Sequence, residues 1–270
     1  MLKINSLTKT FGGLKAVDNI TIDFRPGKVT SLIGPNGAGK TTLFNLISGF
    51  LKPDKGEIVL EVGSEKIEDG RLKIETGSQK LEVRIDKLKP YEIARLGIGR
   101  VFQDVRVFKK LNCVENVVLG KKDIFGENPV HSLIFAKKVK ALSRKSIEEA
   151  EEKLSFVGLL DKKMKFAEDL SFGEQKLLSL ARLIYGDYNI LLLDEPTAGV
   201  NPVMIDKILD LIKKLAKEMN KMVIVIEHNM NVVYQISDWV YFMNEGQITA
   251  FGKPDDVLGN IEVRRIYIGL

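Results

Sequence analysis

The chain contains a single cysteine, Cys113, which excludes an internal disulfide and is typical of a reducing compartment. We interpret this residue as a small buried apolar side chain. The sequence also has no apolar run near the ~20 residues that a membrane helix needs. Residues 1–11 lack the apolar core of a signal peptide. We therefore expect a soluble, cytoplasmic protein.

An excess of charge of one sign is also missing. The formal net charge is +5, with 41 Lys and Arg residues set against 36 Asp and Glu residues. This balance excludes a nucleic-acid-binding tail and a polybasic membrane anchor. At 270 residues, of which 44% are hydrophobic, the chain is long enough for one globular domain with a subdomain.

The most informative feature that is present is a glycine-rich run, Gly34-Pro35-Asn36-Gly37-Ala38-Gly39-Lys40-Thr41. Its glycines allow successive backbone N–H groups to turn toward the phosphates of a nucleotide, Lys40 adds positive charge, and Thr41 can coordinate Mg²⁺. A predicted strand at 29–33 precedes the run and a predicted helix at 42–47 follows it, so phosphate would meet a helix N-terminus. This context favours a nucleotide-binding loop over a glycine-rich turn without a ligand.

Short alternating apolar segments flank this loop. They predict strands at 2–7, 20–24 and 57–62, which we expect to form a small antiparallel sheet beside the nucleotide core. Apolar residues also alternate at 72–74 and 81–85, and this pattern predicts an extra β-hairpin within a charged segment at about 63–88. We interpret the hairpin as a solvated surface elaboration.

Helical patterns dominate from about residue 104 to 186, where Asn112 and Glu115 predict a capping box. Beyond this region, predicted strands at 189–193 and 222–226 alternate with a helix that begins at Asn201-Pro202. Alternating strands and helices imply a parallel sheet, so the fold class is α/β.

Two acidic residues, Asp194 and Glu195, follow the predicted strand at 189–193. They would stand at the edge where open parallel sheets bind ligands. Asp194 is suited to bind Mg²⁺ through its water shell, and Glu195 to orient and deprotonate the water that attacks a γ-phosphate. The alternative, an acidic strand end facing solvent, is a poor explanation beside a phosphate-binding loop.

A second capping box, formed by Ser171 and Glu174, predicts the start of another helix. The pattern alone indicates a well-capped helix, and such an N-terminus also suits an anion. Together these motifs resemble the ABC-type ATPases over essentially the whole chain. The segment 170–175 lies where that family usually carries Leu-Ser-Gly-Gly-Gln, although here Phe172 and Glu174 replace Gly and Gln.

The resemblance implies that ATP and Mg²⁺ bind, with Phe11 stacking on adenine, Gln103 reaching the Mg²⁺ and the attacking water, and His228 contacting the γ-phosphate. The implied catalytic residues are Lys40, Gln103, Glu195 and His228. The implied metal ligands, partly through water, are Thr41, Gln103 and Asp194. The implied ATP-binding residues are Phe11, Gly34, Pro35, Asn36, Gly37, Ala38, Gly39, Lys40, Thr41 and Thr42, with Ser171 and Gly173 acting in trans.

This resemblance also implies a single ABC ATPase domain over residues 1–270. It would combine a P-loop ATPase core with a mostly parallel sheet, at about 1–103 and 187–270, a flanking antiparallel β subdomain, and a helical subdomain at about 104–186. Two such subunits would sandwich ATP in a two-fold symmetric dimer.

Residues 99–108, 198–202 and 266–269 resemble the ATPase subunits of branched-chain amino acid importers. That subtype implies ATP-driven uptake of branched-chain or similar apolar amino acids, by a chain peripheral on the inner face of the cell membrane. Its partners would be a second ATPase subunit, the same or related, integral membrane permease subunits and, indirectly, an extracytoplasmic solute-binding protein. No nucleic acid would take part.

Two alternatives remain at this point. One is an ABC ATPase for another substrate, such as urea or an exported lipid, because the hairpin at about 63–88 departs from the subtype's shorter connection. The other is a soluble ABC switch protein outside transport. Such proteins usually carry long coiled-coil insertions or two cassettes, and this chain shows neither.

Overall fold

The computed structural model describes residues 1–62, 65–68, 71–74, 81–120 and 136–268. The chain divides into two compact units. The first comprises Met1–Arg100, Asn189–Pro196 and Leu209–Leu270, and the second comprises Val101–Tyr188 and Thr197–Ile208.

A six-stranded sheet, in the order β12-β11-β3-β10-β9-β8, holds the first unit together. Neighbouring strands from β11 to β9 run parallel, and β12 is antiparallel to β11. Every residue of β3, β9 and β10 is buried, as expected for apolar strands covered on both faces. The strands are β3 (Val29–Ile33), β8 (Ile98–Val101), β9 (Ile190–Asp194), β10 (Met222–Ile226), β11 (Trp239–Asn244) and β12 (Gln247–Gly252).

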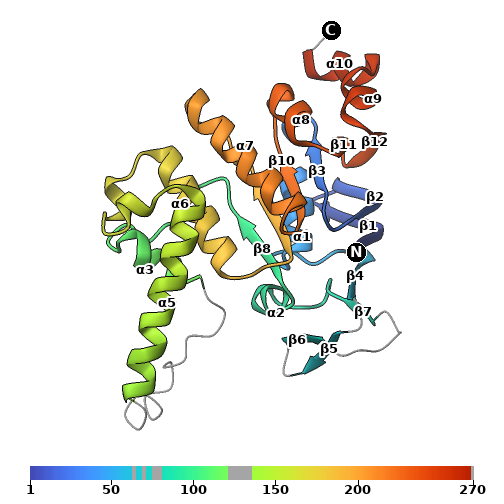
Figure 1. The fold of residues 1–270 in the computed structure, drawn as a ribbon. Coiled ribbons are helices and arrows are strands. Elements are labelled where there is room, and N and C mark those ends of the chain that lie inside the picture. Colours follow the sequence, from blue (N-terminus) through green and yellow to red (C-terminus); the bar gives the residue numbers. More distant parts are fainter. Residues whose placement is uncertain (63–64, 69–70, 75–80, 121–135, 269–270) are drawn as a thin grey trace. The chain divides into compact units, whose positions relative to one another are not determined.

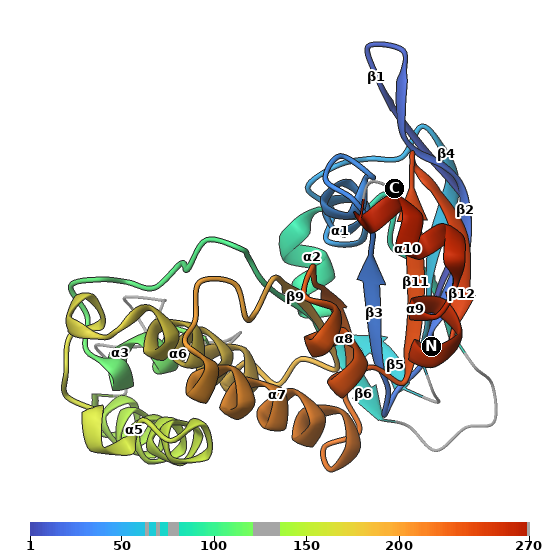
Figure 2. The same cartoon turned by 90° about the horizontal axis from the view of Figure 1, so that it is seen from above.

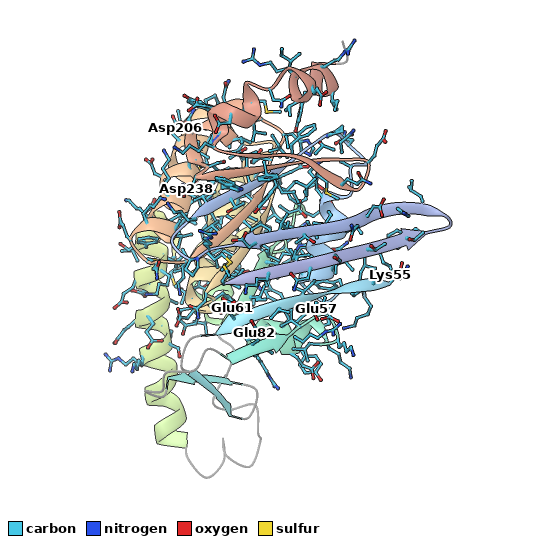
Figure 3. All side chains as sticks on the ribbon, turned by 90° about the vertical axis from the view of Figure 1, so that its right-hand side faces the viewer. Lys55, Glu57, Glu61, Glu82, Asp206 and Asp238 are labelled. Atoms are coloured by element: carbon cyan, nitrogen blue, oxygen red, sulfur yellow. The ribbon has the colours of Figure 1, made fainter. Side chains whose placement is uncertain are left out.

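The antiparallel sheet predicted beside this core is confirmed, with four strands in the order β2-β1-β4-β7. On β4, Ile58 and Leu60 enter the core, whereas Glu57 and Glu61 lie on the charged face (Figure 3). Lys3 pairs with Glu61 there. Period-two alternation therefore separates the two faces. The strands are β1 (Leu2–Phe11), β2 (Leu14–Phe24), β4 (Lys55–Val62) and β7 (Leu81–Arg84).

The hairpin predicted within 63–88 is wrong in its pairing. β6 (Arg71–Ile74) pairs with β5 (Glu65–Glu68), whereas β7 joins the edge of the antiparallel sheet beside β4. Residues 75–80, which the predicted turn would include, lie outside the described residues. Alternation indicates which residues share a face, but it does not indicate which strand edge is free to pair.

Six helices accompany the sheets of the first unit among the described residues, one of them only in part. α1 begins at Lys40, two residues before the predicted helix start. α7 begins in the second unit and continues into the first. The helices are α1 (Lys40–Ile47), α2 (Pro90–Arg95), α7 (Pro202–Lys217), α8 (Met230–Ile236), α9 (Pro254–Leu258) and α10 (Ile261–Ile268).

The second unit is mainly helical, and α3 (Cys113–Val118), α5 (Ala136–Val157) and α6 (Phe172–Tyr185) lie side by side in it (Figure 1). The capping box predicted for α3 is confirmed: Asn112 Oδ1 accepts from Glu115 N at 2.9 Å, and Glu115 Oε2 accepts from Asn112 N at 2.8 Å. Cys113 is buried as interpreted, and burial raises the pKa of its thiol to about 11. None of the described helices combines the length and the apolar character needed to cross a membrane.

Candidate nucleotide-binding site

The glycine-rich loop connects the end of β3 directly to α1. Gly39, the last residue before the helix, has a φ of +102°, and a Cβ placed there would lie 1.9 Å from the carbonyl oxygen of Ala16. Only glycine fits this position without strain. The first N–H groups of α1 have no acceptors within the helix, so the loop presents backbone donors where a phosphate can accept them.

Lys40, at the start of α1, is buried. Its Nζ donates to the carbonyl oxygens of Gly34 and Pro35, each at 2.8 Å. Burial lowers the pKa of Lys40 to about 8, although the negative charges of Glu195 and Asp194 oppose the shift. The side chain is therefore mostly protonated at neutral pH, and its charge is available for a phosphate.

Asp194 ends β9 and is buried in an ion pair with Arg100, whose Nη2 lies 2.9 Å from Asp194 Oδ2. Arg100 Nη1 also donates to Asn45 Oδ1 at 2.7 Å and to Ser48 Oγ at 3.1 Å, which ties β8 to α1. Burial raises the pKa of Asp194, and the hydrogen bond from Arg100 counters the rise. Sequence reasoning missed Arg100, although a charged residue within the partly buried strand at 98–101 was an available signal.

Glu195 and His228 lie together beside this pair of charges. The Nε2 atom of His228 lies 3.0 Å from Glu195 Oε1. Glu195 has a φ of +48°, a left-handed conformation that costs a non-glycine residue about 1–3 kcal/mol, and its N–H donates to the Ile226 carbonyl at 3.0 Å. Glu227 directly follows β10, which ends at Ile226. It is buried, and its carboxylate accepts from the backbone N–H of His228 at 3.2 Å. These bonds hold the backbones of Glu195 and His228 at the strand ends, and the two side chains contact each other.

Phe11 ends β1, before a turn that stands out from the sheet (Figure 2). The ring is 44% exposed, and Lys9 Nζ lies 5.6 Å from its centroid. An exposed ring beside a cation can provide a platform for a planar base.

The other three predicted site residues, Gln103, Ser171 and Gly173, belong to the second unit. Gln103 is exposed after β8. The capping box of α6 is confirmed, because Ser171 N donates to Glu174 Oε2 at 2.8 Å and Glu174 N to Ser171 Oγ at 3.4 Å. Glu174 also pairs with Lys162, so it is held at its own helix start.

The two neighbours Phe172 and Gly173 have different surroundings. A Cβ at Gly173 would lie 2.8 Å from Met204 Cγ, so close packing at the start of α7 requires a small residue there. The Phe172 side chain, which replaces the family's usual glycine, is 46% exposed. It lies over Gly199, where a Cβ would come within 3.1 Å of its ring. Solvent and this glycine accommodate the larger side chain.

A magnesium site is compatible with these donors. Across the described part of the chain, no three His, Cys, Asp or Glu side chains gather as a metal site by themselves. The Thr41 hydroxyl and the Asp194 carboxylate are hard oxygen donors. Mg²⁺ usually takes only one or two protein oxygens and completes its shell with phosphates and water, so this donor set fits.

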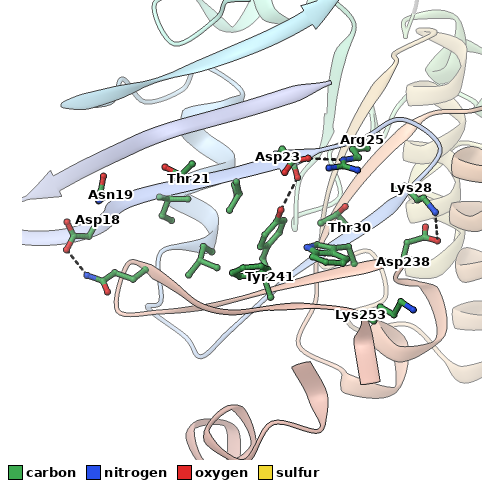
Figure 4. Close-up of a pocket in the computed structure, with 16 residues that line it drawn as sticks. Asp18, Asn19, Thr21, Asp23, Arg25, Lys28, Thr30, Asp238, Tyr241 and Lys253 are labelled. Atoms are coloured by element: carbon green, nitrogen blue, oxygen red, sulfur yellow. Dashed lines mark hydrogen bonds and ion pairs between the residues drawn. The ribbon is translucent and has the colours of Figure 1, made fainter. Parts of the chain in front are cut away.

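A cavity of about 900 Å³ elsewhere in the first unit is lined by residues of β2, β11 and β12 (Figure 4). Its described lining contains none of the residues assigned to the nucleotide. Its acids are paired with neighbouring cations: Asp23 lies 3.0 Å from Arg25, and Asp238 lies 3.7 Å from Lys28. This cavity is therefore separate from the residues assigned to the nucleotide.

A glycine-rich loop between a buried parallel strand and a helix, with acids at the end of a nearby strand, is the arrangement of P-loop nucleotide-hydrolysing proteins. The first unit has this architecture. The sequence pattern of the ABC transporter family matches residues 17–198 of the chain. The chain therefore belongs to the ABC transporter family, as an ATPase that hydrolyses ATP for transport.

Individual relatives agree with this assignment along the full length. The chain is 34% identical over 269 residues to the high-affinity branched-chain amino acid transport ATP-binding protein LivG of Escherichia coli, covering 100% of this chain and 98% of that protein. It is 36% identical to BraF of Pseudomonas aeruginosa, described in the same words, with the same coverage. A solved nucleotide-free ATP-binding cassette from an ABC transporter superposes with a TM-score of 0.78 at 32% identity, covering 100% of this chain and 99% of that one. The predicted α/β cassette fold is confirmed.

The Arg100–Asp194 pair gives the first prediction. Replacing Arg100 with alanine should lower the free energy of unfolding by about 3 kcal/mol, because it leaves the buried Asp194 carboxylate without its cation. Urea unfolding followed by circular dichroism measures the loss. Arg25→Ala is the matched control, since it removes an exposed arginine from its aspartate partner, Asp23, and should cost much less. Equal losses in both variants would contradict the role given to burial.

Proposed function

We propose that this ABC transporter ATPase is the nucleotide-binding subunit of an importer for branched-chain or similar apolar amino acids. The observation that carries the proposal is similarity over the full length, on both sides, to proteins whose names describe that transport. Its partners are integral membrane permease subunits, a second ATPase subunit and, indirectly, an extracytoplasmic solute-binding protein.

We also propose roles for the residues of the first unit. Glu195 orients and deprotonates the attacking water, and its contact with His228 keeps the carboxylate at the strand end. Lys40 exchanges its two carbonyl partners for the phosphates of ATP. Thr41 and Asp194, with Gln103 through water, would hold Mg²⁺, which when bound neutralises charge on the phosphates. Phe11 stacks on the adenine.

For the second unit, the proposal is that Ser171 and Gly173 act on the nucleotide of the opposite subunit. Both lie at the N-terminus of α6, where backbone N–H groups and the helix dipole favour an anion. Because these residues would complete the partner's site, hydrolysis requires two ATPase subunits. The dimer then closes on ATP and opens after hydrolysis, and this movement drives the permease.

Affinity purification tests the transport proposal. The tagged chain, recovered from detergent-solubilised membranes of its own cell, should bring down polytopic membrane subunits and a second ATPase identified by mass spectrometry. Vesicles that carry the recovered complex should then take up labelled leucine in preference to urea. Recovery of only soluble or nucleic-acid-binding partners would overturn the proposal that this chain belongs to an importer. Preferred uptake of urea would overturn the proposal that the transported solute is an apolar amino acid.

Glu195→Gln should retain ATP binding and lower the rate of hydrolysis by about 10²-fold or more, because the amide cannot take the proton from water. Size-exclusion chromatography with ATP should show the variant trapped as a dimer. Glu218→Gln is the matched control, since it makes the same change at an exposed position after α7 and should hydrolyse ATP normally. Undiminished turnover in Glu195→Gln would remove this residue from its proposed role.

Ser171→Ala separates the two roles of the second capping box. If the hydroxyl binds the opposite γ-phosphate, hydrolysis should fall by about 10²- to 10³-fold, as for other lost oxyanion donors. Thermal stability should change little, because the cap bond to Ser171 is long at 3.4 Å. Asn112→Ala is the control: it removes a shorter cap of 2.9 Å from α3 and should cost about 1 kcal/mol of stability without slowing hydrolysis. If Ser171→Ala also lost stability without slowing hydrolysis, Ser171 would act only as a helix cap.

A further inference from the structure

Tyr267, near the end of α10, contacts the first residue of the glycine-rich loop. Its hydroxyl accepts from the Gly34 N–H at 3.1 Å and donates to the Gly34 carbonyl oxygen at 3.2 Å. Residues 233 positions apart in the chain are joined by these two bonds. Tyr267 lies outside the segment 17–198 that matches the family and has no role in the site described above.

Gly34 is a position where lost hydrogen bonds have consequences. It is buried, with a φ of +152°, and a Cβ there would lie 2.0 Å from the Met243 carbonyl oxygen of β11. The backbone at the start of the loop therefore packs directly against the backbone of β11. A buried N–H or carbonyl without a partner is costly, so the Tyr267 hydroxyl satisfies groups that solvent reaches poorly.

The Gly34 carbonyl oxygen accepts from two groups at once, the Tyr267 hydroxyl and the Lys40 ammonium. If Lys40 turns to the phosphates of ATP, this oxygen loses one of its two donors. We propose that Tyr267 is a positioning residue of the nucleotide site, which holds the Gly34 peptide in place and keeps its carbonyl paired when Lys40 leaves. This inference rests on the role proposed for Lys40 and is independent of the transported solute.

The residues around Tyr267 hold its ring in place and keep its hydroxyl protonated. Its ring lies 6.0 Å from that of Phe242 in β11 and packs on the apolar cluster that includes Ile33 and Val263. Burial raises the pKa of the phenol, and the negative charge of Glu227 adds to the rise. The group therefore stays protonated at neutral pH and can donate. α10 thus connects the loop to the core of the first unit (Figure 2).

Tyr267→Phe tests the proposal, because it removes the hydroxyl and keeps the ring. We expect the purified chain to bind ATP about five- to tenfold more weakly, measured by isothermal titration calorimetry. Tyr241→Phe is the matched control: its hydroxyl also donates to a backbone carbonyl, that of Asp23 at 3.1 Å, but on the cavity side of the unit (Figure 4). It should change ATP affinity less than twofold. Equal affinities in the two variants would overturn the proposal.

A double-mutant cycle tests the shared carbonyl directly. In a Lys40→Ala background no ammonium leaves the Gly34 oxygen when ATP binds, so adding Tyr267→Phe should alter the weak remaining affinity by less than about twofold. Thermal shifts at millimolar ATP report this affinity. A similar loss in both backgrounds would overturn the idea that Tyr267 compensates for the departure of Lys40.

Amide exchange provides a readout that needs no nucleotide. In the free chain, NMR should show the Gly34 N–H exchanging at least about tenfold faster in Tyr267→Phe than in the parent, because its acceptor is gone. Tyr241→Phe should leave that exchange unchanged. An equally protected Gly34 amide in Tyr267→Phe would show that the contact does not hold the loop and would overturn the proposal without any reference to transport.

Discussion

The parallel register of β3, β10 and β9 is the constraint on which the site depends. In that register Ile226 of β10 lies opposite Leu32 of β3 on one side and Asp194 of β9 on the other. The carboxyl ends of parallel strands meet at one edge of a sheet, so the glycine-rich loop, the Asp-Glu pair and His228 all follow from the same edge. A slip of one residue would turn each buried side chain to the opposite face and separate these groups.

Buried charge is the second organising feature, and at the nucleotide site both Lys40 and Asp194 are buried with partners. Lys40 donates to two carbonyl oxygens, and Arg100 holds Asp194 while it bonds to α1. These contacts stabilise the charges of Lys40, Arg100 and Asp194 in a site that is shielded from solvent before a nucleotide binds. Tyr267 extends the arrangement, because it keeps the Gly34 peptide paired from a helix near the other end of the chain. The Arg100–Asp194 pair is in place before phosphates bind, whereas Lys40 has to exchange its two carbonyl partners for them.

The predictions of the capping boxes and of the glycine-rich loop succeeded because they depend on neighbours in the sequence. The capping boxes at Asn112 and Ser171 span three residues, and the glycine-rich loop is a contiguous run whose flanking strand and helix are themselves local patterns. The predicted hairpin at about 63–88 failed because it required the correct choice of partner strand. In the structure β7 pairs with β4, and β6 pairs with β5. Alternation alone could not distinguish these arrangements, because any free strand edge offers the same hydrogen-bonding groups.

Local patterns in the sequence establish the chemistry: a loop for phosphates, acids after a buried strand, two capped helices and the family that combines them. Which of these groups meet depends on the fold. It brought Arg100 to Asp194, gave Glu195 its left-handed backbone beside His228, and placed the Tyr267 hydroxyl on Gly34. These contacts join residues far apart in the chain, and a hydrogen bond or ion pair across such a separation depends on the register of strands and the packing of helices, which no local pattern encodes.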